Sequence, residues 1–314
     1  MMLRTLLAAA AAILASAACT ITPDVEAAQP QDRLHLVDLT DEFTAFWTKS
    51  QGMEDAARAA AFKAHFEPIL PGYYAREKAG PFDYNELILK ALKSYPEQRP
   101  GIEEVSRRFR DMMEPARASF EAAFRPVDGM RPIYLLHSLG EMDGGVRNFQ
   151  GGPTMFFGAD VIARNHLGHG IRPFFHHELF HAFHRRYFNG CDQVWCGRWS
   201  EGLAVHVANS LNPGATDAQL LLIRPVPLRQ AVEANRKDVV CAILAQLDST
   251  QTSNLFSGGG KSLGGLPARS GYYVGYLAAA EAGKTRSLQE LAKLPNEQVR
   301  PLVEESLRSL AACA

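Results

Sequence analysis

Residues 173–187 read Pro-Phe-Phe-His-His-Glu-Leu-Phe-His-Ala-Phe-His-Arg-Arg-Tyr. The pattern predicts a helix over Pro173–Tyr187 whose phenylalanine and leucine side chains suit a buried position. Burial would penalise the histidine and glutamate side chains that lie between them if these had no partner. A bound metal ion would resolve that conflict, so the stretch predicts a core helix that carries a metal site.

His177 and His181 are the two residues that can share one ion. On a helix, residues four apart lie about 40° apart around the axis and one turn apart along it, so the two imidazoles can converge on a zinc ion. Glu178 projects about 100° away, within reach of a water molecule on that ion. Zinc lowers the pKa of such a water toward about 7, and Glu178 would take its proton and later pass it to the leaving group.

A catalytic zinc ion usually has three protein ligands and a water, so a third ligand is needed. His184 lies on the same helix, but residues seven apart are separated by about 10 Å along a straight helix axis. The position ten residues after His177, where some zinc enzymes carry a third histidine, is Tyr187. Glu201 belongs to the next predicted helix, roughly Arg198–Leu211, and an antiparallel return past a short loop would bring it back. We therefore expect Glu201 to be the third ligand.

Two motifs carry a resemblance to a known group of enzymes. His177-Glu178-x-x-His181, followed by Trp199-Ser200-Glu201-Gly202-Leu203-Ala204, resembles the gluzincin group of zinc peptidases, whose third ligand is a Glu on the next helix. Within that group, Leu266-Pro267-x-Arg269-x-Gly271-Tyr272-x-Val274-Gly275 is similar to a signature of a bacterial family described as predicted zinc-dependent proteases. The similarity covers residues 173–206 and 266–277.

The resemblance implies a zincin-like catalytic core with His177, His181 and Glu201 as zinc ligands and Glu178 as the catalytic base. It also implies that Tyr272 and Arg269 steady an oxyanion or hold the substrate.

Some of these assignments have alternatives. Tyr272 could instead belong to an aromatic helix face with Tyr273 and Tyr276, and Arg269 to the solvated charges of a loop. Some gluzincins carry an Asp four residues after the ligand Glu, whereas this chain has Val205, so the group that orients the histidines stays open.

The remaining pattern predicts a mainly α-helical protein with a small mixed β-sheet. Apolar residues recur at three- and four-residue steps from Leu36 to Phe124, which predicts a helical N-terminal region over residues 37–128. Ile133–Leu136 and Met155–Phe157 are β-rich runs separated by the glycine-rich stretch Gly140–Gly152. Residues 129–314 are then the zincin-like catalytic domain, ending in further helices.

In the gluzincin group an edge strand beside the metal binds the substrate as an additional strand, and by this analogy we expect Thr154–Phe157 to be that strand. Gly144–Gly145 and Gly151–Gly152 would give nearby loops freedom to move. His176 and His206 neighbour the site and are expected to be structural or to support the ligands.

The first 19 residues resemble an export signal. A short basic start precedes an apolar run, Thr5–Ala15, that is too short to span a bilayer, and small residues follow up to Cys19. Cleavage there would release a soluble protein; alternatively, Cys19 is the lipidated first residue of a bacterial lipoprotein, which would attach the protein to a membrane. Residues 20–36 are polar and predict a tether. We therefore expect an exported protein that is periplasmic, lipid-anchored or secreted.

Four cysteines remain after Cys19. In an oxidising compartment an even number of cysteines indicates disulfides, and we expect pairs between Cys191 and Cys196 and between Cys241 and Cys313. Four buried free thiols are the alternative.

Composition sets the remaining limits. A net charge of −1 gives no long-range attraction to nucleic acid or to anionic membranes, so we expect neither as a partner. Gly258–Ser262 ends like a phosphate-binding loop, but Leu255 stands where that motif needs a glycine, so we interpret it as a flexible loop.

The expected function is that of an exported zinc metallopeptidase that hydrolyses peptide bonds of a peptide or protein through a zinc-bound water activated by Glu178. The alternatives are a catalytically silent zincin-fold binding or scaffold protein, and a hydrolase of non-peptide esters or amides.

Overall fold

The computed structural model describes residues 35–124, 132–251, 253–256 and 266–313. The expected signal segment, the tether up to residue 34 and the loop Gly258–Ser262 lie outside the described residues. Within the described ranges, no helix is long and apolar enough to cross a membrane.

The protein is mainly helical with one small mixed sheet, which confirms the predicted fold class at that level. The helices are α1 Thr40–Lys49, α2 Asp55–Phe66, α3 Tyr84–Phe124, α4 Ala159–Asn165, α5 Arg172–His184, α6 Val194–Leu211, α7 Leu228–Glu233, α8 Arg236–Leu244, α9 Ser253–Phe256, α10 Ser270–Ala282, α11 Leu288–Ala292 and α12 Asn296–Leu310.

The sheet contains four strands in the order β1-β4-β6-β5, and a separate short hairpin joins β2 to β3. Strand β4 pairs in parallel with β1 and β6, and β5 is antiparallel to β6. The strands are β1 Leu36–Asp38, β2 Lys78–Ala79, β3 Phe82–Asp83, β4 Ile133–Leu136, β5 Gly144–Phe149 and β6 Gly152–Gly158.

Strand β1 corrects the prediction for the start of the folded region. We expected a tether up to residue 36 and helix from there onward, but Leu36–Asp38 is a strand. Its three residues lie in register with β4, with Val37 beside Tyr134. Three residues are too few to show a strand periodicity in the sequence. The strand forms because it pairs with β4, which is distant in the sequence.

Strand β5 corrects the prediction for the glycine-rich stretch. Gly144–Phe149 is a strand, and it is joined to β6 by Gln150 and Gly151, which have φ values of 49° and 80°. Two positive φ values are typical of a tight type I′ hairpin turn, not of a mobile loop. Thr154–Phe157, which we expected at the edge, lies in β6 between β4 and β5. A fully buried apolar run suits such an interior position, and the edge strand is β5.

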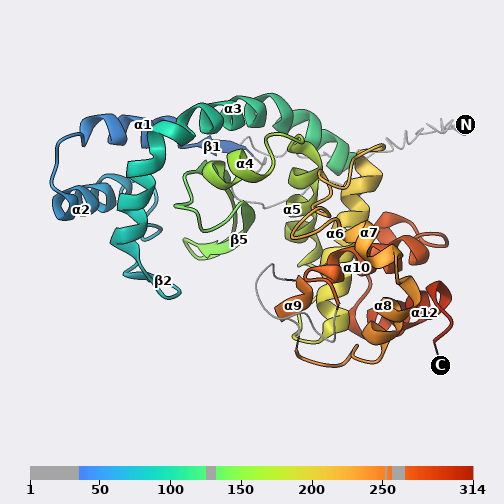
Figure 1. Ribbon diagram of the computed structural model, residues 1–314. Helices are drawn as coiled ribbons and strands as arrows, with labels where there is room; N and C mark the ends of the chain where they lie inside the picture. Colours follow the sequence, from blue (N-terminus) through green and yellow to red (C-terminus); the bar gives the residue numbers. More distant parts are fainter. Residues whose placement is uncertain (1–34, 125–131, 252, 257–265, 314) are drawn as a thin grey trace, which may run out of the picture.

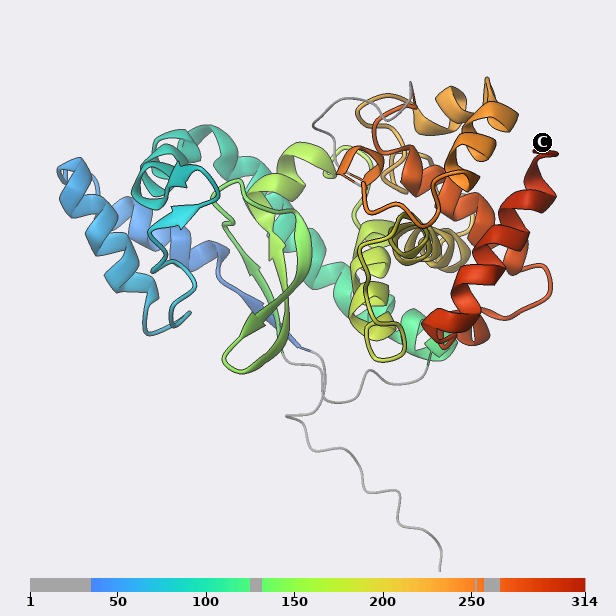
Figure 2. The same ribbon diagram turned by 90° about the horizontal axis from the view of Figure 1, so that it is seen from below.

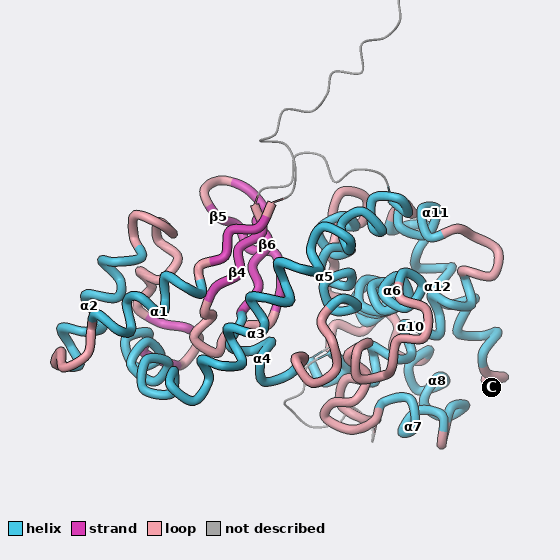
Figure 3. Tube along the Cα trace, turned by 90° about the horizontal axis from the view of Figure 1, so that it is seen from above, coloured by secondary structure: helices cyan, strands magenta, loops and turns pink. Residues whose placement is uncertain are grey.

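Helix α3 connects the two halves of the molecule (Figure 1). It contacts α1 and α2 of the N-terminal region, and it contacts α4, α5 and α11 of the C-terminal half. The sheet lies between these two groups of helices (Figures 2 and 3). The expected boundary at residue 128 lies outside the described residues, and regions 37–128 and 129–314 share both the sheet and the contacts of α3.

Helices α5, α6 and α10 form the centre of the C-terminal half. Helices α6 and α10 touch at two glycines, because a Cβ atom on Gly202 would lie 2.0 Å from the carbonyl carbon of Gly275. Neither residue can carry a side chain there, and the two helix backbones are in direct contact.

Helix α6 begins at Val194, earlier than the expected Arg198. The backbone N–H groups of Val194 and Trp195 donate to the carbonyl oxygens of Ser249 and Leu247 at 2.9 and 3.0 Å. These long-range bonds satisfy N–H groups that the first turn of a helix leaves without a partner. Local sequence could not show them.

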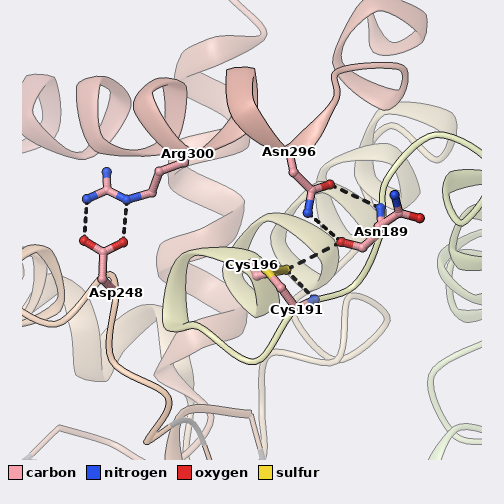
Figure 4. The surroundings of a disulfide bond; sticks show 6 residues. All are labelled: Asn189, Cys191, Cys196, Asp248, Asn296 and Arg300. Atoms are coloured by element: carbon pink, nitrogen blue, oxygen red, sulfur yellow. Dashed lines mark hydrogen bonds and ion pairs between the residues drawn. A yellow bond between two sulfur atoms is a disulfide. The ribbon is translucent and has the colours of Figure 1, made fainter.

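Both expected disulfides are present. Cys191–Cys196 has a Cα–Cα distance of 5.7 Å and ties the loop before α6 to its first turn, and Cys241–Cys313 has 5.4 Å and ties the C-terminal end to α8. The side-chain amide of Asn296, at the start of α12, accepts a hydrogen bond from the backbone N–H of Asn189 in the same loop and donates one to its carbonyl oxygen (Figure 4). Two disulfides indicate an oxidising environment.

The two disulfides should differ in their effect on stability. The Cys241–Cys313 bond joins residues 72 apart in the sequence, whereas Cys191–Cys196 joins residues 5 apart. A longer closed loop restricts the unfolded chain more, so removal of the first bond should lower the free energy of unfolding by about 4 kcal/mol and removal of the second by about 2 kcal/mol. Urea unfolding of the double variants C241S/C313S and C191S/C196S measures both. Equal losses in the two variants would contradict the loop-closure explanation.

Candidate metal centre

Helix α5 holds two histidines on one face because the rest of the helix is fixed in the core. Pro173 occupies its first turn, where the missing N–H costs nothing. Its apolar side chains are almost fully buried: Phe174, Phe175, Leu179, Phe180 and Phe183. The helix therefore has one fixed rotation about its axis, and His177 and His181 point toward α6.

Helix α6 brings Glu201 to the same point. The Nε2 atoms of His177 and His181 are 3.0 Å apart, and Glu201 Oε2 lies 3.4 Å from each of them. These three residues form a group whose ligand atoms could hold a metal ion.

The size of this triangle fits a small divalent cation. Zinc in a tetrahedral site has bonds of about 2.0–2.1 Å to nitrogen and oxygen, so two of its ligand atoms are about 3.3 Å apart. The observed separations of 3.0 and 3.4 Å agree with that spacing. Three protein ligands leave a fourth position open, which is typical of catalytic sites; structural zinc sites usually have four.

The charges of the three groups depend on one another. Burial alone would raise the pKa of Glu201, but the two facing imidazoles hold it well below its usual range. Burial lowers the pKa of His177. It acts in the same direction on His181, but the carboxylate of Glu201 outweighs it and raises the pKa of His181. A buried carboxylate is thus neutralised here by a proton on an imidazole, and a metal ion can take that proton's place.

Glu178 lies beside this group and is half-buried. Burial raises the pKa of Glu178 to about 7; His181 opposes this shift, and the carboxylates of Glu201 and Asp143 add to it. A carboxyl group with a pKa near neutrality can both accept and release a proton under working conditions.

Gly144, the first residue of β5, packs directly on Glu178. A Cβ atom at this position would lie 2.9 Å from Glu178 Cγ and 2.8 Å from Phe174 Cζ. The absence of a side chain therefore lets the edge strand approach the carboxyl group closely. The sequence predicts a mobile loop at Gly144–Gly145, whereas this glycine pair begins the strand that packs against Glu178.

Tyr272 and Arg269, at the start of α10, also reach the site. The ring of Tyr272 stacks on that of His177 with centroids 6.4 Å apart, and the Arg269 guanidinium lies 4.3 Å from the centre of the Tyr272 ring. Burial raises the pKa of Tyr272 well above its usual value, so its hydroxyl keeps its proton and can donate a hydrogen bond. All six expected site residues are therefore close together.

The three other histidines considered in the sequence analysis, His176, His184 and His206, lie outside the ligand group. His184 stacks between Phe180 and Phe188, with ring centroids 5.0 and 4.9 Å away, and it is outside the ligand group. His176 accepts from the Asn212 amide at Nδ1 and faces the carbonyl of Ala116 with Nε2, so it joins α3 to the end of α6.

His206 on α6 is half-buried, and its ring lies 6.1 Å from that of Tyr276. It packs against Gly283 at the end of α10, where a Cβ atom would lie 2.9 Å from its Nε2. Its contacts are thus with α10, and it is outside the ligand group.

Two clefts meet at the ligands. The first, of about 320 Å³, is lined by Gly144, His177, Tyr272 and Arg269, and also by Asp143, Asn165, His166, Phe174, Ala218, Leu221, Ile223 and Arg224. The second, of about 500 Å³, is lined by Gly145 and Val146 and by the loop Phe188–Gly190. Glu178, His181 and Glu201 line both clefts.

Three residues of the first cleft, Asp143, His166 and Arg224, could not be predicted as site residues from the sequence. His166 Nε2 and Asp143 Oδ2 are 2.8 Å apart, and the ring of His166 stacks on Phe174 with centroids 4.3 Å apart. Arg224 comes from the long segment between α6 and α7. None of the three belongs to a recognisable sequence motif. They reach the metal ligands only because segments that are distant in the sequence fold together.

Metal binding should depend on Glu201 and not on His184. Glu201→Gln removes the negative charge from the ligand set and should weaken metal binding by at least about 100-fold, whereas His184→Phe keeps the ring stacking and should bind metal normally. Metal content after dialysis against an equimolar mixture of first-row divalent ions tests both. Loss of metal from His184→Phe with retention in Glu201→Gln would reverse the assignment.

No family model, curated protein or solved structure is significantly similar to this chain. The resemblance to gluzincins therefore consists of the two motifs themselves, and the functional conclusion depends on the geometry of the site.

Proposed function

We propose that this protein is an exported zinc-dependent metallopeptidase with a zincin-like, gluzincin-type catalytic core. One observation carries the proposal: the carboxyl group of Glu178 stands beside three converging ligand atoms, from His177, His181 and Glu201, at the junction of two clefts. A structural metal site has no need of an adjacent base or an open ligand position.

The chain's own residues divide the work. His177, His181 and Glu201 would hold the zinc ion, which, when bound, acidifies a water molecule and polarises the scissile carbonyl. Glu178 accepts the proton of the attacking water at its carboxylate and then delivers it to the leaving nitrogen. Its raised pKa suits both directions of this transfer.

Tyr272 and Arg269 are placed to assist. The Tyr272 hydroxyl retains its proton, and its ring lies against His177, so the hydroxyl can donate a hydrogen bond to the negative charge that develops on the carbonyl oxygen. Arg269, stacked on that ring, keeps it in place and adds positive charge to the first cleft.

Strand β5 offers the backbone that an extended peptide needs. It is an edge strand, and its residues Gly144 to Val146 pass along both clefts beside Glu178. A substrate that adds to this edge as a further strand would have its backbone fixed relative to the metal. Extended binding of this kind favours peptides over small esters or amides, which cannot pair with a strand.

Two separate features support the proposal that the protein is exported. The two disulfides fit an oxidising compartment. The N-terminal sequence, with its basic start, short apolar run and Cys19, fits a signal segment with either release or lipid attachment. The protein would then act on peptides or proteins outside the cytoplasm.

Glu178→Gln should separate catalysis from metal binding. The amide cannot accept the proton, so kcat on a cleaved library peptide should fall by about 10²- to 10⁴-fold while the metal content stays the same. Glu97→Gln, on the exposed surface of α3, is the matched control. Undiminished turnover by Glu178→Gln would remove the proposed mechanism and leave a catalytically silent metal protein as the better description.

Gly144→Ala should displace the base or the edge strand. The added Cβ atom meets Glu178 at 2.9 Å, and a misplacement approaching 1 Å can cost about 10²-fold in rate, so kcat/KM should fall strongly with metal content unchanged. In Gly168→Ala, where a Cβ atom meets nothing within 4 Å, the rate should be normal. Equal rates for both variants would show that the strand's close approach to Glu178 is not required.

A further inference from the structure

The first cleft contains two arginines that are held in place without a carboxylate partner. Arg224 Nη1 donates to Asn165 Oδ1 at 2.6 Å, and both residues line the cleft. Arg269 lies over the ring of Tyr272. Within the part of the chain that the structure describes, neither guanidinium forms an ion pair, in contrast to Arg229, Arg236, Arg300 and Arg308.

The acidic groups of the same cleft are engaged elsewhere. Asp143 accepts from Gly144 N at Oδ1 and is paired with His166 at Oδ2. Glu201 faces the two ligand histidines, and Glu178 lines the cleft beside them. With a divalent cation bound, the positive charge of the cleft therefore exceeds its negative charge, and two sets of guanidinium donors remain available.

The direction of the edge strand shows which part of a substrate reaches these arginines. Strand β5 starts at Gly144 in the first cleft and continues through Val146 in the second. A peptide that pairs antiparallel to it, the more stable arrangement, runs the opposite way. Its residues on the C-terminal side of the scissile bond then lie in the first cleft.

We propose that the first cleft is an anion subsite in which Arg224 and Arg269 bind a carboxylate of the substrate on the C-terminal side of the scissile bond. This inference rests on the proposed peptidase function and adds its substrate class. The carboxylate is either the free C-terminus of a short peptide or an acidic side chain. Guanidinium groups suit both, because their paired N–H donors match the two carboxylate oxygens.

Binding to an inactive form tests the subsite without requiring turnover. The full-length, zinc-loaded Glu178→Gln protein is titrated into three fluorescein-labelled pentapeptides: Ala-Ala-Leu-Ala-Ala with a free carboxylate, the same peptide as its amide, and the amide with a terminal Asp in place of Ala. Anisotropy gives each Kd. The acid or the Asp amide should bind about 10- to 100-fold more tightly than the neutral amide, the range expected for charge-assisted hydrogen bonds. Whichever of the two binds better identifies the source of the carboxylate.

Variants show whether the arginines cause the preference. Arg224→Gln and Arg269→Gln, each added to Glu178→Gln with metal content checked, should remove most of it, and Arg224→Lys should retain part. Arg164→Gln, an exposed arginine of α4 outside both clefts, should leave it intact. Equal affinity for all three peptides, no binding of any of them, or a preference that survives both glutamine variants would overturn the subsite.

Cleavage of the same peptides by the wild-type protein separates the two proposals. Cleavage without a preference for the carboxylate would contradict the subsite and leave the peptidase function standing. An arginine-dependent binding preference with no cleavage would keep the subsite and contradict the peptidase function.

Discussion

The contact between α6 and α10 at Gly202 and Gly275 is the constraint on which the site depends. A Cβ atom on either glycine would collide with the backbone of the other helix. The two helix backbones can therefore touch here because both positions are glycine. Glu201 precedes Gly202 directly, and Tyr272 stands one turn before Gly275. The ligand and the proposed oxyanion donor are thus placed by the same contact, which explains why each of the two sequence motifs contains one of its glycines, Gly202 and Gly275.

The second constraint is electrostatic. Helix α5 buries four aromatic rings and a leucine, and this fixes its polar residues at a place where unpartnered charge is costly. Glu201 and the two imidazoles relieve that cost together. Burial acts to lower the pKa of both histidines, but the carboxylate of Glu201 outweighs it at His181, so only the pKa of His177 ends below its ordinary value. At Glu178, burial and the nearby carboxylates outweigh the opposing effect of His181, so its pKa is raised. One helix therefore carries both groups suited to binding a cation and a carboxyl group suited to proton transfer.

The sequence was informative where chemistry and local periodicity coincide. The spacing of His177 and His181, the glycine-flanked Glu201 and the pairing of the cysteines all followed from residue types, and the structure places each accordingly. The sequence failed where pairing is non-local. Strand β5 looked like a loop because Gly144 and Gly145 have low strand propensity, and only pairing with β6 overrides this. Arg224 could not have been found, because its position depends on a long segment without regular structure.

The N-terminal region is part of the site's support and not a separable attachment. Strand β1 extends the sheet that ends in β5, through β4 and β6. Helix α3 packs on α5 through Phe109 against Phe175, with centroids 6.1 Å apart, and the carbonyl of Ala116 faces His176. The residue before the first ligand histidine is therefore held by α3. An inhibitory segment or a lid must be able to move away from the site while the site stays folded. Helix α3 does not meet this condition, because its removal would expose the aromatic face that sets the rotation of α5. The helical region is best understood as the scaffold that fixes the edge strand and the ligand helix relative to each other.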